Sequence, residues 1–200
     1  MQSIGQSIQF QQFNGYLQGQ GKSRYSIHNL SWQVNQGEHW LLLGANGAGK
    51  SALAAALVGE AKHESGQRVS TFTNLELVSS DAQKQLLNKE LEGEKLSAVE
   101  ELIFTDQNYN AGLREKLIKL FKFNELLTRH FRDLSTGETR KLLLIKALSS
   151  NADLVVLDEP FNGLDVQSCE QLNEILIELS QAITFVFVLN RLDEIPSFIT

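Results

Sequence analysis

Alternating hydrophobic and polar positions mark the first strands of this chain. Two segments near the start show the two-residue period of a strand with one buried face. Their apolar positions are Ile8, Phe10 and Phe13 in the first, and Leu30, Trp32 and Val34 in the second. The pair Asn14-Gly15 favours a turn, so we expect the first strand to end there. Residues 17–23 are rich in glycine and glutamine and predict a loop.

Short, nearly continuous apolar runs predict further strands that are buried on both faces. The clearest runs are residues 39–43, 154–157 and 183–189, with 69–72 and 75–78 as two shorter ones. The segment 60–67 is polar and is read as a connection.

Helical patterns occupy the spaces between these strands. Residues 52–58 are rich in alanine, and residues 111–121 place leucines on one face. Ser97 and Glu100 have the spacing of a capping box and predict a helix start. Residues 81–94 are charged and weakly periodic, so a solvated helix and an ordered insertion stay open. Together these patterns predict an α/β fold in which a helical subdomain, about residues 81–150, is inserted into a sheet.

Composition narrows the class of protein. The 200 residues, 42% of them hydrophobic, suffice for one domain with a full core. No apolar run approaches the roughly 20 residues that span a bilayer, and the start lacks a signal-peptide pattern, so we expect a cytoplasmic protein. The lone Cys169 fits a reducing compartment. A net charge of −6 argues against a global nucleic-acid surface but leaves a local basic patch open.

A glycine-rich segment carries the first candidate chemistry. It has the form G-x-x-x-x-G-K-S between a predicted strand and a predicted helix. In such a loop the backbone N–H groups hold phosphates, the lysine reaches the outer phosphates and the hydroxyl binds magnesium. The sequence therefore predicts a site for ATP and Mg²⁺, with binding residues Gly44, Ala45, Asn46, Gly47, Ala48, Gly49, Lys50, Ser51 and Ala52.

Two carboxylates end the apolar run 154–157. In enzymes with a phosphate loop, an acidic residue at the end of such a strand holds magnesium, and we expect Asp158 to do so with Ser51. Glu159 is the candidate that orients and deprotonates the attacking water. Downstream of the phosphate loop, Ser135 stands where the N-cap of an amphipathic helix belongs.

Four segments in this order resemble the ATP-binding cassette (ABC) ATPases: G-A-N-G-A-G-K-S, L-S-T-G-E, L-V-V-L-D-E-P and F-N-G-L-D. The resemblance implies a P-loop NTPase of the ABC type, with a mixed sheet core and an antiparallel β subdomain, covering residues 1–200. It also implies a second cassette, as a homodimer or a tandem domain, packed head to tail. Residues acting across that interface would be Ser135, Thr136, Gly137 and Asp165. For the aromatic residue that stacks on adenine, we choose Tyr16 over Tyr25.

Several positions depart from the family pattern. Thr136 and Glu138 stand where the family usually has glycine and glutamine, which predicts weaker contact with the second nucleotide. Asn190 stands where the family has a histidine that contacts the γ-phosphate. Because asparagine hydrogen-bonds without a positive charge, we expect slow hydrolysis with ATP binding retained. The usual glutamine after residues 75–78 is displaced, with Ser80 at its place and Gln83 nearby.

The biological role is open at this stage. The segments L-S-T-G-E-T-R-K and V-L-N-R-L-D-E-I-P resemble a tandem-cassette subgroup whose names link it to molybdate transport and to photorepair. A membrane permease is then a candidate partner, which would place the protein at the inner membrane. A non-catalytic regulatory module, or one associated with DNA repair, is the alternative. The family usually continues through another strand pair after the position of Asn190, so we expect a longer native chain.

Overall fold

The computed structural model describes residues 5–19, 23–92, 97–105, 108–190 and 195–199. Its strands form two sheets. The first is an antiparallel sheet in the order β2-β1-β4, from β2 (Arg24–Asn35), β1 (Ser7–Gln18) and β4 (Lys62–Ser70). The second is parallel in the order β3-β7-β6-β5, from β3 (Trp40–Leu43), β7 (Thr184–Leu189), β6 (Leu154–Asp158) and β5 (Leu75–Val78). The predicted α/β fold is confirmed.

Strand β1 continues through the turn predicted at Asn14-Gly15, so that prediction is wrong. The register of β1 shifts at this point against both neighbouring strands. The Asn14 side chain accepts a hydrogen bond from the N–H of Asn29 at 2.9 Å and donates one to the Ser65 hydroxyl at 3.1 Å. The Asn14 side chain therefore connects the β-bulge in β1 to both neighbouring strands by hydrogen bonds. The polar segment 60–67 is also not a connection, because most of it lies in β4.

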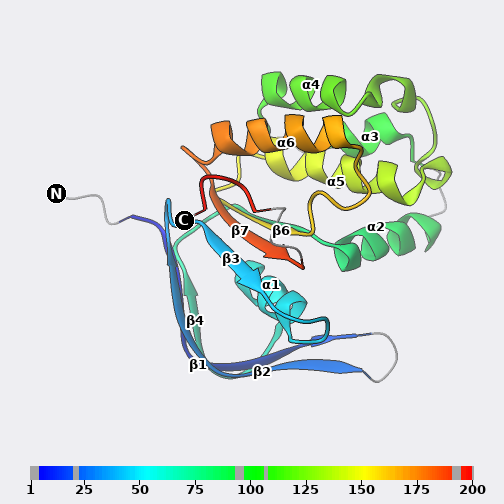
Figure 1. Cartoon of the computed structure of the whole chain (residues 1–200). Coiled ribbons are helices and arrows are strands. Elements are labelled where there is room, and N and C mark those ends of the chain that lie inside the picture. Colours follow the sequence, from blue (N-terminus) through cyan, green and yellow to red (C-terminus); the bar gives the residue numbers. More distant parts are fainter. Residues whose placement is uncertain (1–4, 20–22, 93–96, 106–107, 191–194, 200) are drawn as a thin grey trace.

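Helix α1 (Lys50–Val58) lies between the two sheets (Figure 1). Alternate residues of the buried strands explain this layering. Leu154 and Val156 of β6 pack in one apolar cluster with α1 and β1, whereas Val155 and Leu157 face the helices on the other side. Both faces of β6 are therefore buried, which is why its sequence is a continuous apolar run.

Four helices separate β5 from β6: α2 (Ser80–Glu92), α3 (Val99–Phe104), α4 (Ala111–Leu120) and α5 (Thr136–Ser149). Of the two interpretations left open for residues 81–94, the structure shows the helix, as α2. Two short 3₁₀ turns, η1 (Phe123–Leu126) and η2 (Phe131–Asp133), connect α4 to α5, and α6 (Val166–Leu179) follows β6. No helix within the described ranges has the length and apolarity to cross a membrane.

The two predicted helix starts have different outcomes. Ser135 is the N-cap of α5: its hydroxyl accepts from the N–H of Glu138 at 3.3 Å, and Glu138 accepts from the N–H of Ser135 at 2.7 Å. The capping box predicted at Ser97 is wrong, because α3 is capped by Ala98 without a side-chain hydrogen bond. Ala98 instead pairs with His130 in an isolated β-bridge, so a long-range contact sets this helix start.

Candidate nucleotide-binding site

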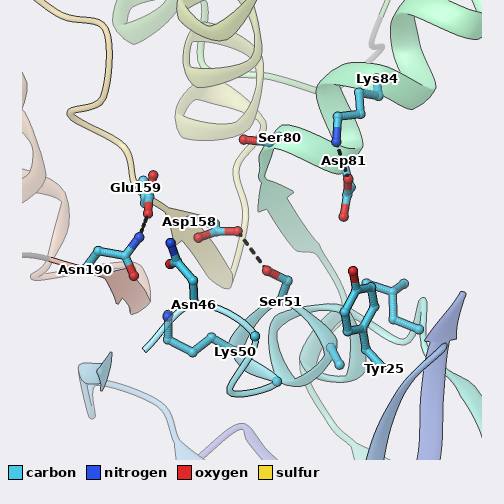
Figure 2. A pocket seen from close by; sticks show the side chains of 14 residues that line it. Tyr25, Asn46, Lys50, Ser51, Ser80, Asp81, Lys84, Asp158, Glu159 and Asn190 are labelled. Carbon is cyan, nitrogen blue, oxygen red and sulfur yellow. Dashed lines mark hydrogen bonds and ion pairs between the residues drawn. The ribbon is translucent and has the colours of Figure 1, made fainter. Parts of the chain in front are cut away.

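A pocket of about 350 Å³ opens where α1 meets the end of β6 (Figure 2). Helix α1 provides one wall through the phosphate loop, and β6 provides Asp158 and Glu159. The remaining walls come from the start of α2, the end of β7 and the hairpin β1–β2. The lining residues are Leu17, Tyr25, Asn46, Gly47, Gly49, Lys50, Ser51, Ala52, Ser80, Asp81, Lys84, Asp158, Glu159 and Asn190.

The phosphate loop has the backbone that an anion site needs. Gly47 and Gly49 have φ angles of 83° and 90°, a left-handed region that suits glycine. Gly49 caps α1, and the first turn of α1 contains no acidic residue, so its free N–H groups are electropositive. The Nζ atom of Lys50 donates to the carbonyls of Gly44 at 2.6 Å and Ala45 at 3.2 Å. The Lys50 side chain thus folds back along the phosphate loop.

Ser51 and Asp158 meet across the pocket. The Ser51 hydroxyl donates to Oδ2 of Asp158 at 3.4 Å, although the two residues are 107 positions apart. A hydroxyl and a carboxylate are hard oxygen ligands of the kind that Mg²⁺ prefers, so these two residues fit the predicted metal. Burial, reinforced by the charge of Glu159, raises the pKa of Asp158, while Arg140, Ser51 and Lys50 oppose the shift. A bound cation would favour the ionised carboxylate.

Glu159 has an unusual backbone, and each oxygen of its side chain accepts a hydrogen bond. Its φ of 52° lies in the left-handed region, which few residues other than glycine adopt. Asn190 donates to one carboxylate oxygen, and Asn162 donates to the other at 3.2 Å. The side chain therefore projects from the end of β6 in a fixed direction, next to Asp158 and opposite the phosphate loop (Figure 2).

Sequence reasoning missed Arg140, which holds the two acidic residues from behind. Its guanidinium is almost fully buried and donates to the main-chain carbonyls of Asp158 and Glu159. Burial lowers the pKa of Arg140, and the charges of the two carboxylates oppose this shift. The sequence pattern of α5 could have revealed this residue. Arg140 lies on the same face of the helix as Leu144 and Leu148, which are both buried. A cation in an apolar helical stripe indicates a specific buried partner.

The ABC transporter family matches residues 27–162 of the chain, which include the phosphate loop and the two carboxylates at the end of β6. The chain belongs to this family. The ATP-binding protein ModF of Escherichia coli K12 is 44% identical over 177 residues, which are 83% of this chain and 36% of ModF. The glutathione/L-cysteine transport protein CydC of the same organism is 30% identical, over 88% of this chain and 33% of CydC. The chain thus spans about a third of each of these two relatives.

Solved structures show the same fold. A putative cobalt transport ATP-binding protein has a TM-score of 0.71 at 24% identity, covering 93% of this chain and 71% of that protein. An ATP-bound bacterial exporter of the Atm1 family has a TM-score of 0.70 at 15% identity, covering 96% of this chain and 36% of that one. The predicted ABC-type fold is therefore confirmed, in agreement with the family match.

In this ABC cassette Tyr25 lines the pocket and Tyr16 does not. Which of the two stacks on adenine stays a prediction. Neighbouring strand residues point to opposite faces of the sheet. Tyr25 pairs with Leu17, and both lie on the pocket face, which leaves Tyr16 on the other face. There the guanidinium of Arg24 covers the Tyr16 ring at 3.7 Å.

The residues predicted to act across the cassette interface lie outside the pocket. Ser135 and Thr136 are exposed at the start of α5, and Asp165 is exposed as the N-cap of α6. A Cβ atom on Gly137 would stand 3.6 Å from the carbonyl oxygen of Gly163, so the first turn of α5 lies next to the loop between β6 and α6. Their role toward a second nucleotide remains a prediction.

Gln83, on α2, contacts the segment that contains Ser135, Thr136 and Gly137. Its amide donates to the carbonyl of Thr136 at 2.7 Å, whereas Ser80, at the place expected for a glutamine, lines the pocket itself. The displaced glutamine thus contacts the L-S-T-G-E segment rather than the phosphate loop.

Proposed function

We propose that this cassette binds Mg²⁺-ATP between the phosphate loop and the end of β6 and hydrolyses it slowly. The observation that carries the proposal is the meeting of Lys50 and Ser51 with Asp158 and Glu159 in one pocket. One wall offers N–H groups and an ammonium group to phosphates, and the other offers carboxylates to a divalent cation and to water.

Each residue then has a defined task. The N–H groups at the start of α1 and the ammonium of Lys50 hold the phosphates and offset their charge. Magnesium, held by Ser51 and Asp158, would supply further neutralisation of the phosphate oxygens. Glu159 orients the attacking water and accepts its proton at the side-chain carboxylate. Asn190 offers a hydrogen bond but no positive charge, which supports slow turnover.

We further propose that hydrolysis takes place against a second cassette, either another copy or a tandem domain. Ser135, Gly137 and Asp165 lie at the ends of α5 and α6, next to Val166, whose side chain is 76% exposed. Such an exposed apolar residue beside two helix N-termini suits a surface that closes on a partner with bound phosphates. The Glu138 carboxylate occupies the start of α5, which supports weaker phosphate contact there.

The process that this cassette serves is proposed from resemblance. The sequence resemblance to a subgroup whose names link it to molybdate transport supports a role in energising or regulating molybdate-type transport through a permease at the inner membrane. The likeness to ModF, which is named as an ABC transporter ATP-binding protein, supports a transport role in general. A regulatory or DNA-repair-associated module without hydrolysis is the second candidate, and the missing charge at Asn190 favours it. DNA binding that weakens steeply as salt rises would support the repair role.

Phosphate release with the wild type and Glu159→Gln tests the enzymatic proposal. We expect both proteins to bind ATP in the presence of Mg²⁺, and only the wild type to release phosphate. Glu125→Gln, at an exposed position of turn η1, is the matched control and should behave as the wild type. Equal, near-zero release by wild type and Glu159→Gln with retained ATP binding would favour the non-catalytic module.

A further inference from the structure

Two amide groups from separate elements hold the carboxylate of Glu159. Asn190, at the end of β7, donates to Oε1, and Figure 2 shows this contact. Asn162, in the loop between β6 and α6, donates from Nδ2 to Oε2 at 3.2 Å. Because each oxygen has its own donor from a different direction, the carboxylate cannot rotate without losing one of the two bonds.

The backbone of Glu159 is held as firmly as its side chain. Its N–H donates to the carbonyl of Val188 at 2.8 Å, and its carbonyl accepts from Arg140 and from the N–H of Asn162 at 3.1 Å. A residue with a φ of 52° keeps this conformation only where its surroundings fix it. Asn162 supplies two of these bonds, one from its main chain and one from its side chain.

We infer that Asn162 is a positioning residue for hydrolysis, which fixes the Glu159 carboxylate through its side-chain amide. This inference rests on the proposed function, in which Glu159 accepts the proton of water. A carboxylate has about four lone-pair directions, so two amide donors leave about two free to accept from a water molecule. Asn162 therefore orients the base without occupying it, and Asn162 itself does not line the pocket.

Two substitutions separate this role from that of an ordinary turn residue. Asn162→Ala removes the donor, and Asn162→Asp replaces it with a negative charge of the same shape that faces Glu159. Asparagine and aspartate both suit turns, so a residue needed only for the turn would tolerate the aspartate. We expect kcat to fall about tenfold with alanine and about a hundredfold with aspartate, with ATP affinity unchanged. Asn151→Asp, at the far end of β6, is the matched control.

A second measurement does not depend on turnover. Asn162→Asp alone should lower Tm by about 2–4 °C, because two carboxylates then face each other. In a Glu159→Gln background the same substitution should leave Tm unchanged, since the amide of the introduced glutamine can donate to the introduced carboxylate. Equal Tm shifts in the two backgrounds would overturn the inference. So would a kcat for Asn162→Asp equal to that of the wild type.

These readouts also separate the inference from the proposed function. A wild type that binds ATP without hydrolysing it would contradict slow hydrolysis, and the difference in Tm shifts would still decide whether the amide holds Glu159. A wild type that hydrolyses ATP, with both Asn162 variants equally active, would contradict the inference alone.

Discussion

Replacing Arg140 by methionine should be among the most damaging single changes near the pocket. The arginine is only 6% exposed, and its guanidinium donates to the main-chain carbonyls of Asp158 and Glu159. Methionine has a similar length and fills the space, but it leaves both carbonyl oxygens without this donor. The substitution therefore tests whether the end of β6 is held in place from α5.

The magnitude follows from the bonds that are lost. A hydrogen bond to a charged group contributes about 1.5–3 kcal/mol, so losing two gives an upper range near 6 kcal/mol. The Nε atom of Arg140 is buried with no partner among the described residues, and removing it recovers part of this cost. We expect a net loss of about 3 kcal/mol in the free energy of unfolding, which is a fall in Tm of about 6–12 °C.

Urea denaturation measures this change directly. Arg140→Lys should lose about half as much, because an ammonium group keeps the charge but cannot present the fork of a guanidinium. Arg24→Met is the control, since Arg24 forms an exposed ion pair with Glu64 that should contribute no more than about 1 kcal/mol. An Arg140→Met protein whose unfolding free energy lies within about 0.5 kcal/mol of the wild type would refute this reasoning.

Three further predictions concern the pocket and the sheet. Tyr25→Ala should raise the Kd for Mg²⁺-ATP by about tenfold in a titration, because stacking on the base is lost, whereas Tyr16→Ala should leave the Kd unchanged. The reverse result would identify Tyr16 as the residue that stacks on adenine. Asn190→His should raise the phosphate-release rate by adding a positive charge at the γ-phosphate, and an unchanged rate would remove the explanation for slow turnover. Asp153 accepts hydrogen bonds from the N–H groups of residues 73 and 74 at 2.7 and 2.9 Å. Burial raises the pKa of Asp153, but the hydrogen bonds that it accepts outweigh burial, so the pKa is lowered. Its contribution is therefore present above the pKa of the unfolded chain, about 4, and is lost as pH falls through the lower folded value. Asp153→Asn should cost about 1 kcal/mol at pH 7 and less near pH 3 by urea denaturation, and a cost independent of pH would contradict this assignment.

Local patterns in the sequence predicted the parts of the site that lie close together along the chain. The phosphate loop depends on glycines at fixed spacing before a helix, so eight consecutive residues specify its backbone. The prediction of Ser135 as the N-cap of a helix was equally local. The apolar run of β6 predicted where Asp158 would stand, because a strand buried on both faces leaves polar residues only at its end.

Long-range geometry explains what the sequence could not provide. The bulge in β1 near Asn14 shifts the alternation of side chains, so Leu17 rather than Tyr16 faces the pocket. The contact between Arg140 and the carbonyls of β6 joins residues 18 and 19 positions apart on two elements. Ser97 failed as a cap because Ala98 pairs with His130 instead. In each case a contact between separate elements outweighed the local signal.

Calorimetric titration of the protein with ATP, in the presence of Mg²⁺ and then of EDTA, tests the central claim most directly. If the N–H groups of the phosphate loop face Ser51 and Asp158 across a divalent cation, ATP binds tightly with Mg²⁺ and much more weakly without it. Asp158→Asn should then reduce the difference between the two conditions. An absence of ATP binding under both conditions, or an ATP affinity of the wild type that does not depend on Mg²⁺, would contradict the site described above.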